Sequence, residues 1–326
     1  MIIFPAGKPL IYALALFTAS APLWAQTYPN KPVRLIVPFA PGGGSDIIAR
    51  ILAPHAGALL GQQFIIDNRP GAGTIIGAEI AAKAPPDGYT LFLGITGTMA
   101  INPSIYRKLP YDPVRDFAAI GMVGTGPNVL VVHPALPAQS IRELITIAKS
   151  HPGKLSYASA GTGGAPHLAG ELFKSMAGID MVHIPYKGAA PATVDLLAGQ
   201  VQVMFAGMGA ALPFIKSNRL RALGVAGAKR SRVLPAVPAI GEVLKGFEAS
   251  TWFALFAPAG TPPPVIAQLN LTFTKTVALP EVERQMIDQG YEPLTGTPDE
   301  LKSYVASEIA KWAKVIRAAR IPQEGG

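Results

Sequence analysis

Strand-like and helix-like segments alternate along most of the 326-residue chain, and this alternation restricts its fold more than any other feature. The segment 33–39 is a β-branched apolar run, and the segment 45–61 carries apolar residues at helical spacing. Successive β/α units predict an α/β protein with mostly parallel sheets and covering helices. Further strands are predicted at 62–70, 89–95, 129–134, 154–160, 180–186, 201–207, 220–227 and 247–260, and further helices at 74–84, 140–153, 166–178, 191–199, 213–218, 262–278 and 297–319.

The alternation is interrupted twice, near residues 100–125 and 245–260. Within the first interruption, the segment 101–120 is rich in Pro and Tyr, which favours an irregular excursion. Two sheets with the chain crossing between them twice would produce both interruptions. We therefore expect two α/β lobes. The predicted bounds are 26–124 together with 251–326 for the first lobe, and 125–250 for the second.

The first 25 residues have the pattern of a secretory signal peptide. Lys8 is followed by an apolar stretch from Leu10 to Ala25, after which the chain turns polar. A transmembrane anchor is the alternative, but Pro22 and the marginal length disfavour it. We predict cleavage near Ala25 and export to the periplasm. Because the chain contains no cysteine, the exported protein would depend on its core without disulfides.

The overall composition favours a globular protein and gives little support to nucleic-acid binding. The chain is 49% hydrophobic and 15% charged, so it can bury a large core. Its formal charge is +8, but the basic residues are scattered, with no run longer than Lys229-Arg230. Because a nucleic-acid surface needs clustered positive charge, we expect no nucleic-acid partner.

The stretch "PFAPGGGSD" closes the first predicted strand and opens a helix. Glycines at this place leave the N–H groups of the first helical turn open to a small anion. The loop has no Lys of the kind that a nucleotide P-loop carries, which disfavours a nucleoside triphosphate. The other interpretation is a plain tight turn with Ser45 or Asp46 as the helix cap.

A second loop of the same kind, "SAGTGGAPH", follows the predicted strand of the other lobe. Ligands of open α/β sheets bind beyond the carboxyl ends of the strands, so two such loops fit one cleft. The hydroxyls of Ser159 and Thr162, together with backbone N–H groups, could bind a carboxylate without any arginine. His167 lies in the first helical turn and is either a ligand contact or an ordinary polar residue at a helix start.

Catalytic and cofactor patterns are sparse. The chain has no G-x-S-x-G or H-E-x-x-H motif, and its five histidines lack metal-ligand spacing. The stretch "RPGAGTIIGAE" imitates a dinucleotide fingerprint, but its glycine spacing differs, and the strand that follows ends without an acidic residue. We therefore expect no enzyme activity, no cofactor and no metal.

Two further residues are candidates for lining a cleft. Tyr186 ends a predicted strand at the edge of the presumed cleft. Met204 follows the strand "VQVMF" and either lines a pocket or packs in the core.

Several long motifs, in order along nearly the whole mature chain, resemble the Bug family, the extracytoplasmic solute-binding subunits of tripartite tricarboxylate transporters. They are "YPNKPVRLIVPFAPGGGSDIIAR", "DNRPGAGTIIGAEIAAKAPPDGYTLFLG", "INPSIYRKLPYDPVRDF", "HIPYKGAAPATVDLLAGQV" and "FAPAGTP". The sequence departs from the family pattern at Gln202, where Asp is common, and at Ala254, where Gly is usual. These departures caution against copying a ligand from any relative.

The resemblance implies a two-lobed, type II periplasmic-binding-protein fold that closes on a small carboxylate and delivers it to a membrane permease. It also implies that the two glycine-rich loops and the "TGT" segment at Thr96–Thr98 face the cleft. With the two candidates above, the expected ligand-binding residues are Phe39, Ala40, Gly42, Gly43, Gly44, Ser45, Asp46, Thr96, Thr98, Ser159, Ala160, Gly161, Thr162, Gly163, His167, Tyr186 and Met204.

We therefore expect a monomeric periplasmic receptor for a dicarboxylate, an amino acid or an aromatic acid. A ligand sensor that partners a signalling receptor is the main alternative, and an α/β enzyme is a more distant one.

Overall fold

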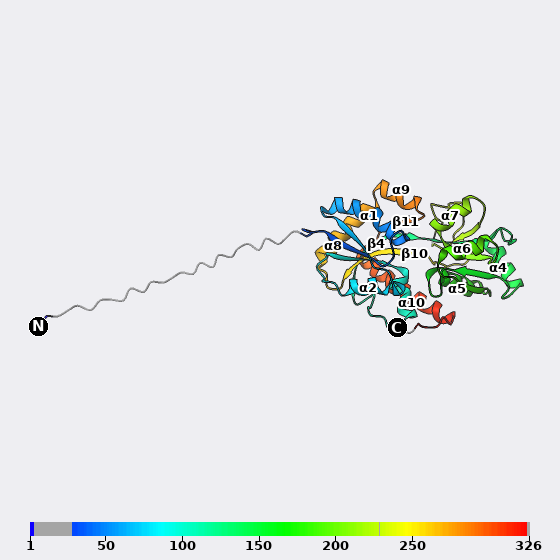
Figure 1. The fold of residues 1–326 in the computed structure, drawn as a ribbon, viewed down its shortest axis with the longest axis horizontal. Helices are drawn as coiled ribbons and strands as arrows, with labels where there is room; N and C mark the ends of the chain where they lie inside the picture. The colour runs from blue at the N-terminus through cyan, green and yellow to red at the C-terminus, as the bar shows by residue number, and fades with distance from the viewer. Residues whose placement is uncertain (3–27, 228, 325–326) are drawn as a thin grey trace.

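Two mixed β-sheets, each covered by helices on both faces, form two lobes that lie side by side (Figure 1). The computed structural model describes residues 1–2, 28–227 and 229–324. Most of the predicted signal peptide lies outside these residues. In the described part of the chain, no helix combines the length and the apolar character that a membrane span requires.

The six-stranded sheet of the first lobe has the order β11-β4-β10-β3-β1-β2. The strand β1 pairs in parallel with β2 and β3, whereas β10 runs antiparallel to both of its neighbours, β3 and β4. The strands are β1 (Val33–Val37), β2 (Phe64–Asn68), β3 (Thr90–Ile95), β4 (Phe117–Gly126), β10 (Thr251–Pro258) and β11 (Glu292–Pro293).

The five-stranded sheet of the second lobe has the order β7-β6-β8-β5-β9. The strand β6 pairs in parallel with β7 and β8, whereas β5 runs antiparallel to β8 and β9. The strands are β5 (Asn128–Val132), β6 (Ser156–Ser159), β7 (Val182–Pro185), β8 (Val203–Gly207) and β9 (Arg221–Val225).

The sheets are mixed where we expected mostly parallel pairing, and the two crossings between the lobes explain the difference. The chain enters the second sheet at β5, directly after β4, and returns to the first sheet at β10. Both crossing strands begin at the edge where the sheets meet and run away from it. Most other strands run toward that edge, so β5 and β10 are antiparallel to their neighbours.

Helices cover both faces of each sheet. In the first lobe, α1, α8 and α9 pack on one face, and α2, α3 and α10 on the other. In the second lobe, α4 and α5 lie on one face, and α6 and α7 on the other. The helices are α1 (Gly44–Leu60), α2 (Ile75–Ala82), α3 (Asn102–Ile105), α4 (Ile141–Ser150), α5 (Ala165–Ala177), α6 (Ala189–Leu197), α7 (Met208–Lys216), α8 (Pro263–Val277), α9 (Pro280–Asp288) and α10 (Pro298–Ala318), with short helical turns η1 (Ala72–Thr74), η2 (Gly97–Ile101) and η3 (Ile240–Glu242).

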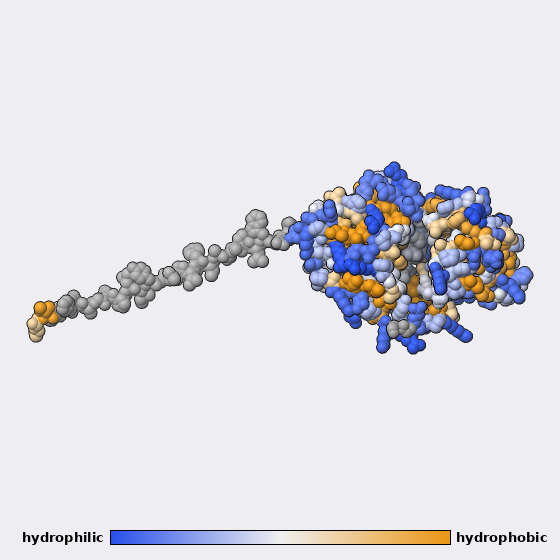
Figure 2. All heavy atoms as spheres, viewed as in Figure 1, coloured by the Kyte–Doolittle hydropathy of each residue, from blue (hydrophilic) through white to orange (hydrophobic). Residues whose placement is uncertain are grey.

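The largest apolar core is continuous between the lobes. It joins Phe92 of the first sheet and Phe205 of the second with Trp312 of α10, and α10 also contacts α5 directly. In the view of Figure 2, hydrophilic residues spread over both lobes, with apolar patches between them. Packing across α10 therefore ties the lobes together in addition to the two chain crossings.

The region of the first sequence interruption is more ordered than we expected. The irregular excursion expected over 101–120 is confined to residues 106–116, with η2 and α3 before it and the ten-residue strand β4 after it. Alternating small and apolar residues with several glycines hide this strand from a hydrophobicity pattern. The helix α9 was also missed, because its charged sequence shows few apolar residues.

Candidate functional site

Strand direction brings the two glycine-rich loops to one edge. The strand β4 ends at Gly126 and β5 begins at Asn128, so the sheets face each other at this point. The strands β1 and β3 run in the same direction as β4, and their carboxyl ends lie at this edge. In the second sheet Asn128 pairs with Gly207, which places the carboxyl ends of β6, β7 and β8 at the facing edge. The segments after β1, β3, β6, β7 and β8 therefore all begin at the interlobe edge.

Four helices that start at this edge, α1, α5, α6 and α7, have a glycine N-cap and no side-chain cap. Gly188 of α6 has φ 114°, a conformation that itself favours glycine, so the other three caps are the informative ones. These three are Gly43 (φ −79°, ψ 168°), Gly164 (φ −72°, ψ 160°) and Gly207 (φ −59°, ψ 134°), conformations open to any residue. A Cβ would meet its nearest atom at 3.6 Å on Gly43 and 3.8 Å on Gly164, and no atom within 4 Å on Gly207. Neither backbone strain nor crowding requires these glycines.

Of the helices that start elsewhere, α4 and α10 are capped by side chains, whereas α8 and α9 begin after Pro262 and Leu279 without a side-chain cap. The helices α4 and α10 follow strands that run away from the interlobe edge. Ser140 of α4 accepts a hydrogen bond from the Glu143 N–H, and Thr297 forms a reciprocal capping box with Glu300. Each of these caps pairs a hydroxyl residue with a Glu three positions on, a spacing that the sequence itself displays. Among the described α-helices, a glycine N-cap, which leaves the N–H groups and the positive end of the helix dipole unobstructed, thus occurs only at the interlobe edge.

Asp46 holds the first glycine loop in place through hydrogen bonds within the first lobe. Its side chain is 2% exposed and accepts hydrogen bonds from the Gly42 N–H (2.8 Å), Arg50 Nε (2.8 Å) and Asn68 Nδ2 (3.0 Å). Burial alone would raise the pKa of this carboxyl group, but these hydrogen bonds outweigh burial and hold the pKa below its ordinary value. The carboxylate is therefore ionised and directed into the first lobe.

The second glycine loop is held by a pair of stacked histidines. The Ser159 hydroxyl is fully buried and lies 2.7 Å from Nε2 of His183. The ring of His183 stacks on that of His167 with 3.8 Å between centroids. His167 Nδ1 accepts a hydrogen bond from the Gly163 N–H at 2.9 Å, so this nitrogen carries no proton. Burial, and then the charge of a protonated His183, lower the pKa of His167 to about 4.

The two threonines predicted after β3 turn their hydroxyls into the protein. Thr96 and Thr98 are both fully buried. Thr96 Oγ accepts a hydrogen bond from the Trp252 N–H at 2.9 Å, and Thr98 Oγ lies 2.6 Å from Thr74 Oγ. Their position at the interlobe edge follows from β3, and their contacts secure the segment that follows that strand.

The other predicted residues differ in exposure. Tyr186 is half-buried and donates a hydrogen bond to Asp195 at 2.7 Å. Met204 is 2% exposed and packs in the core of the second lobe. Among the remaining predicted residues, Ala40, Gly42 and Thr162 are exposed, Phe39, Gly44, Ala160 and Gly161 are half-buried, and Ser45 is buried.

A cavity of about 470 Å³ lies between the lobes. It includes no residue of the predicted set, but it lies next to that set because Ile47 follows Asp46 in the chain. On the second-lobe side it reaches Met208, the first residue of α7. Its walls are Ile47, Gly126, Asn128, Gly207, Met208, Gly209, Ala210, Thr251, Phe253, Asp288, Gln289, Gly290 and Tyr291.

Sequence reasoning missed these wall residues. Ile47 looked like core packing of α1, and Tyr291 follows the undetected helix α9. The nearest sequence signal is the predicted Met204, four residues before Met208.

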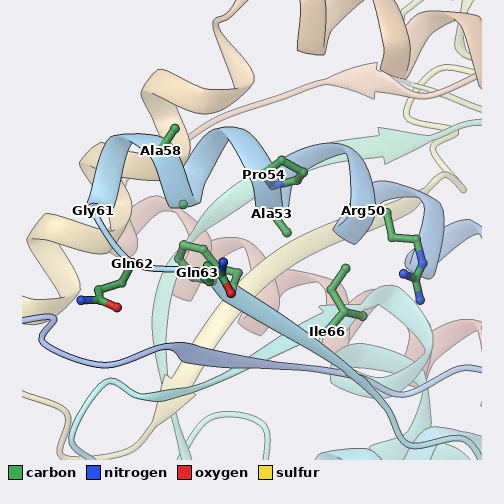
Figure 3. Close-up of a pocket in the computed structure, with 10 residues that line it drawn as sticks. Arg50, Ala53, Pro54, Ala58, Gly61, Gln62, Gln63 and Ile66 are labelled. Atoms are coloured by element: carbon green, nitrogen blue, oxygen red, sulfur yellow. The ribbon is translucent and has the colours of Figure 1, made fainter.

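A larger cavity of about 700 Å³ lies away from the interlobe edge (Figure 3). It is a groove between α1 and the edge strand β2, with Arg50, Pro54 and Ile66 among its walls. It is confined to one lobe, so closure of two lobes could not enclose a solute there.

Comparison with known proteins agrees with this architecture. A family model described as "Tripartite tricarboxylate transporter family receptor" matches residues 48–321. Protein BugT of Bordetella pertussis is 40% identical over 314 residues, which cover 94% of this chain and 96% of BugT.

Solved structures extend the similarity to both lobes. Rpa4515 of R. palustris, solved with adipate, is 37% identical with a TM-score of 0.78, over 91% of this chain and all of the other. MatC of Rhodopseudomonas palustris, with bound malate, is 32% identical with a TM-score of 0.73, over 89% of this chain and all of MatC. The periplasmic binding protein BugD is 35% identical with a TM-score of 0.75, over 91% and 100%. The chain therefore belongs to the receptor family of tripartite tricarboxylate transporters, which includes the Bug proteins, and has their two-lobed periplasmic-binding-protein fold.

Proposed function

We propose that this protein captures a small organic carboxylate between its lobes and delivers it to membrane permease subunits. The glycine N-caps Gly43, Gly164 and Gly207 carry the proposal. Ser, Thr, Asp and Asn are preferred at this position, and local structure does not demand glycine at any of the three sites. Glycine at these positions is explained if a carboxylate must reach the uncapped N–H groups. Relatives solved with adipate and malate support the same class of ligand.

The proposed binding residues are those of the two glycine loops, held by Asp46 in the first lobe and by His167 in the second. We assign residues 26–124 and 251–326 to the first lobe and 125–250 to the second. Residues 1–25 act as a signal peptide that is cleaved near Ala25, so that the mature protein works in the periplasm as a monomer without enzyme activity.

Binding works through differential affinity. A carboxylate contacts both loops at once only when the lobes are closed, so ligand shifts the population toward the closed form. The permease then recognises the closed form and receives the solute. Because N–H groups and helix dipoles hold the anion without a buried arginine, release requires no strong ion pair to break.

The experiment is a calorimetric screen of carboxylates, followed by Gly43→Val and Gly164→Val. Both sites accept a Cβ without strain or clash, so the melting temperature of the free protein should stay close to that of the wild type. The valine methyl groups would obstruct the N–H groups, and affinity should fall by about tenfold or more.

Gly241→Val is the matched control, since a Cβ there meets only Phe247 O at 3.4 Å and lies away from the loops. Unchanged affinity in both loop variants would show that the N-termini do not hold the ligand.

A further inference from the structure

The interlobe cavity has walls from both lobes and lies beside two of the uncapped helix N-termini. Ile47 belongs to the first turn of α1, and Met208 begins α7. Phe253 and Tyr291 close the first-lobe side, where their rings form a T-shaped pair with 5.6 Å between centroids. A volume of about 470 Å³ is in the range of small-molecule sites. The cavity is therefore placed to enclose the part of a solute that extends beyond its carboxylate.

The walls of this cavity offer nothing that would pair with a second negative charge. All thirteen wall residues lie in the described part of the chain, and they include no Lys, Arg or His. The one carboxylate, Asp288, is exposed at the end of α9 and would repel an anion. Burying a charged group without a partner is costly. The walls therefore favour an uncharged ligand body, which Ile47, Met208 and Phe253 can contact.

Tyr291 presents a hydrogen-bond donor at the α1 end of the cavity. A Cβ on Gly44, the first residue of α1, would lie 2.5 Å from the Tyr291 hydroxyl oxygen, so the phenol sits directly over that helix start. No residue in the described part of the chain forms a hydrogen bond with this hydroxyl. Burial raises the pKa of Tyr291, which keeps the hydroxyl protonated and able to donate.

We propose that the cavity is a specificity subsite for monocarboxylates with an uncharged, apolar body, such as aromatic or medium-chain aliphatic acids. The Tyr291 hydroxyl and the first-turn N–H groups of α1 form the first-lobe side of the carboxylate site, opposite the second glycine loop, and the apolar walls take the rest of the ligand. This inference rests on the proposed function and narrows the class of ligand that the receptor selects.

The direct experiment is calorimetry on the full mature chain with two matched ligand pairs, hexanoate against adipate and benzoate against terephthalate. Each pair differs by one carboxylate on a similar carbon skeleton. We expect the monocarboxylate to bind more tightly by about tenfold or more in at least one pair. Equal or tighter binding of the diacid in both pairs would overturn the subsite while leaving carboxylate capture intact. Binding of none of the four acids would overturn the subsite, and it would overturn carboxylate capture as well if the wider calorimetric screen also finds no ligand.

Two variants locate the selectivity. Ile47→Lys adds a cation to the cavity wall. In the pair that shows selectivity, this variant should improve the affinity for the diacid by about tenfold relative to the monoacid. Leu59→Lys adds the same charge to an exposed position of the same helix and should change neither affinity. Tyr291→Phe keeps the ring but removes the donor, and should weaken the monoacid roughly fivefold or more. Selectivity that stays unchanged in Ile47→Lys would show that the ligand body lies elsewhere.

Discussion

Gly209 and Gly290 meet back to back across the two lobes. A Cβ on Gly209 would lie 2.6 Å from the Gln289 carbonyl oxygen, and one on Gly290 would lie 2.7 Å from the Gly209 nitrogen. Gly209 belongs to α7 of the second lobe, and Gly290 follows α9 of the first. The absence of both side chains lets the backbones touch, so this pair limits how closely the lobes approach.

Gly209→Ala should therefore hinder closure. Gly209 has an ordinary backbone conformation near the start of a helix, where alanine is intrinsically favourable, so the free protein should unfold at a similar temperature once the lobes move apart enough to relieve the 2.6 Å contact with Gln289. Ligand affinity, measured by calorimetry, should fall by about tenfold because the closed form is strained. Undiminished affinity would mean that closure does not use this contact. Gly241→Ala, which meets only ordinary contact distances, is the control.

Arg232 forms a charged clasp across the same side of the molecule. It pairs with Glu283 of α9 and Glu292 of β11, and its own N–H also donates to Glu292 at 2.7 Å. Because the pair with Glu283 is exposed, Arg232→Gln should lower the free energy of unfolding by about 1 kcal/mol or less. The clasp joins the lobes, so ligand affinity should become roughly two- to fivefold weaker and less sensitive to salt.

The neighbouring Arg230 supplies the matched control. Its side chain is 50% exposed, against 54% for Arg232, but it pairs with Glu242 within its own lobe. Arg230→Gln should leave affinity and its salt dependence unchanged. If the two variants changed affinity equally, the cause would be the loss of one positive charge from the protein surface and not the loss of the clasp.

Stability should depend on pH through His167. Its pKa in the folded protein is lowered to about 4, so below the ordinary value of 6.5 the unfolded chain binds more protons. The contribution of His167 to the free energy of unfolding is therefore fully present above pH 6.5 and is lost as the pH falls toward 4. The loss is on the order of 3 kcal/mol. His183, Glu171 and Lys174 also act on His167.

Urea titrations between pH 4 and 7.5 would measure this loss. His167→Asn can still accept the Gly163 N–H but does not titrate, so its free energy of unfolding should vary less with pH than that of the wild type. The lowered pKa of His183 leaves a residual slope. A variant curve parallel to that of the wild type would contradict the assignment.

Glu308 is expected to stabilise the junction of the lobes. This carboxylate is 3% exposed and accepts hydrogen bonds from the indole N–H groups of Trp252 (3.1 Å) and Trp312 (3.0 Å), with Lys311 beside it. Glu308→Ala leaves these donors without their shared acceptor and should lower the free energy of unfolding by about 3 kcal/mol. Glu308→Gln, which keeps an oxygen acceptor, should cost less. Denaturation followed by tryptophan fluorescence compares the variants.

Much of the fold could be predicted from the sequence because local signals agreed with the final structure. The caps at Ser140 and Thr297 and the strands that run into glycine loops were visible in residue order alone. The strand β4 was not, because its apolar pattern is interrupted by glycines. Glu308 was invisible as well, since an acid within an amphipathic helix normally faces solvent, and only tertiary structure brings two indoles to it.

The candidate site shows the same division. The two glycine-rich loops of the site begin where strands end, and a sequence pattern can locate the ends of strands. Its walls depend on which distant segments meet, and Tyr291 reaches Gly44 only through the antiparallel return of β11. The sequence allows Asp46 to be a helix cap or a ligand-binding residue, and its three hydrogen bonds within the first lobe show what it holds in place.

The single core that runs through α10 has a consequence for how such receptors can be recombined. Because α10 contributes Trp312 to apolar packing that also includes Phe205 of the second sheet, neither lobe is a self-sufficient module. A chimaera that exchanges only the second lobe with a relative would pair a foreign surface with this helix. Transfer of ligand preference between family members should therefore succeed when α10 travels with the lobe it supports.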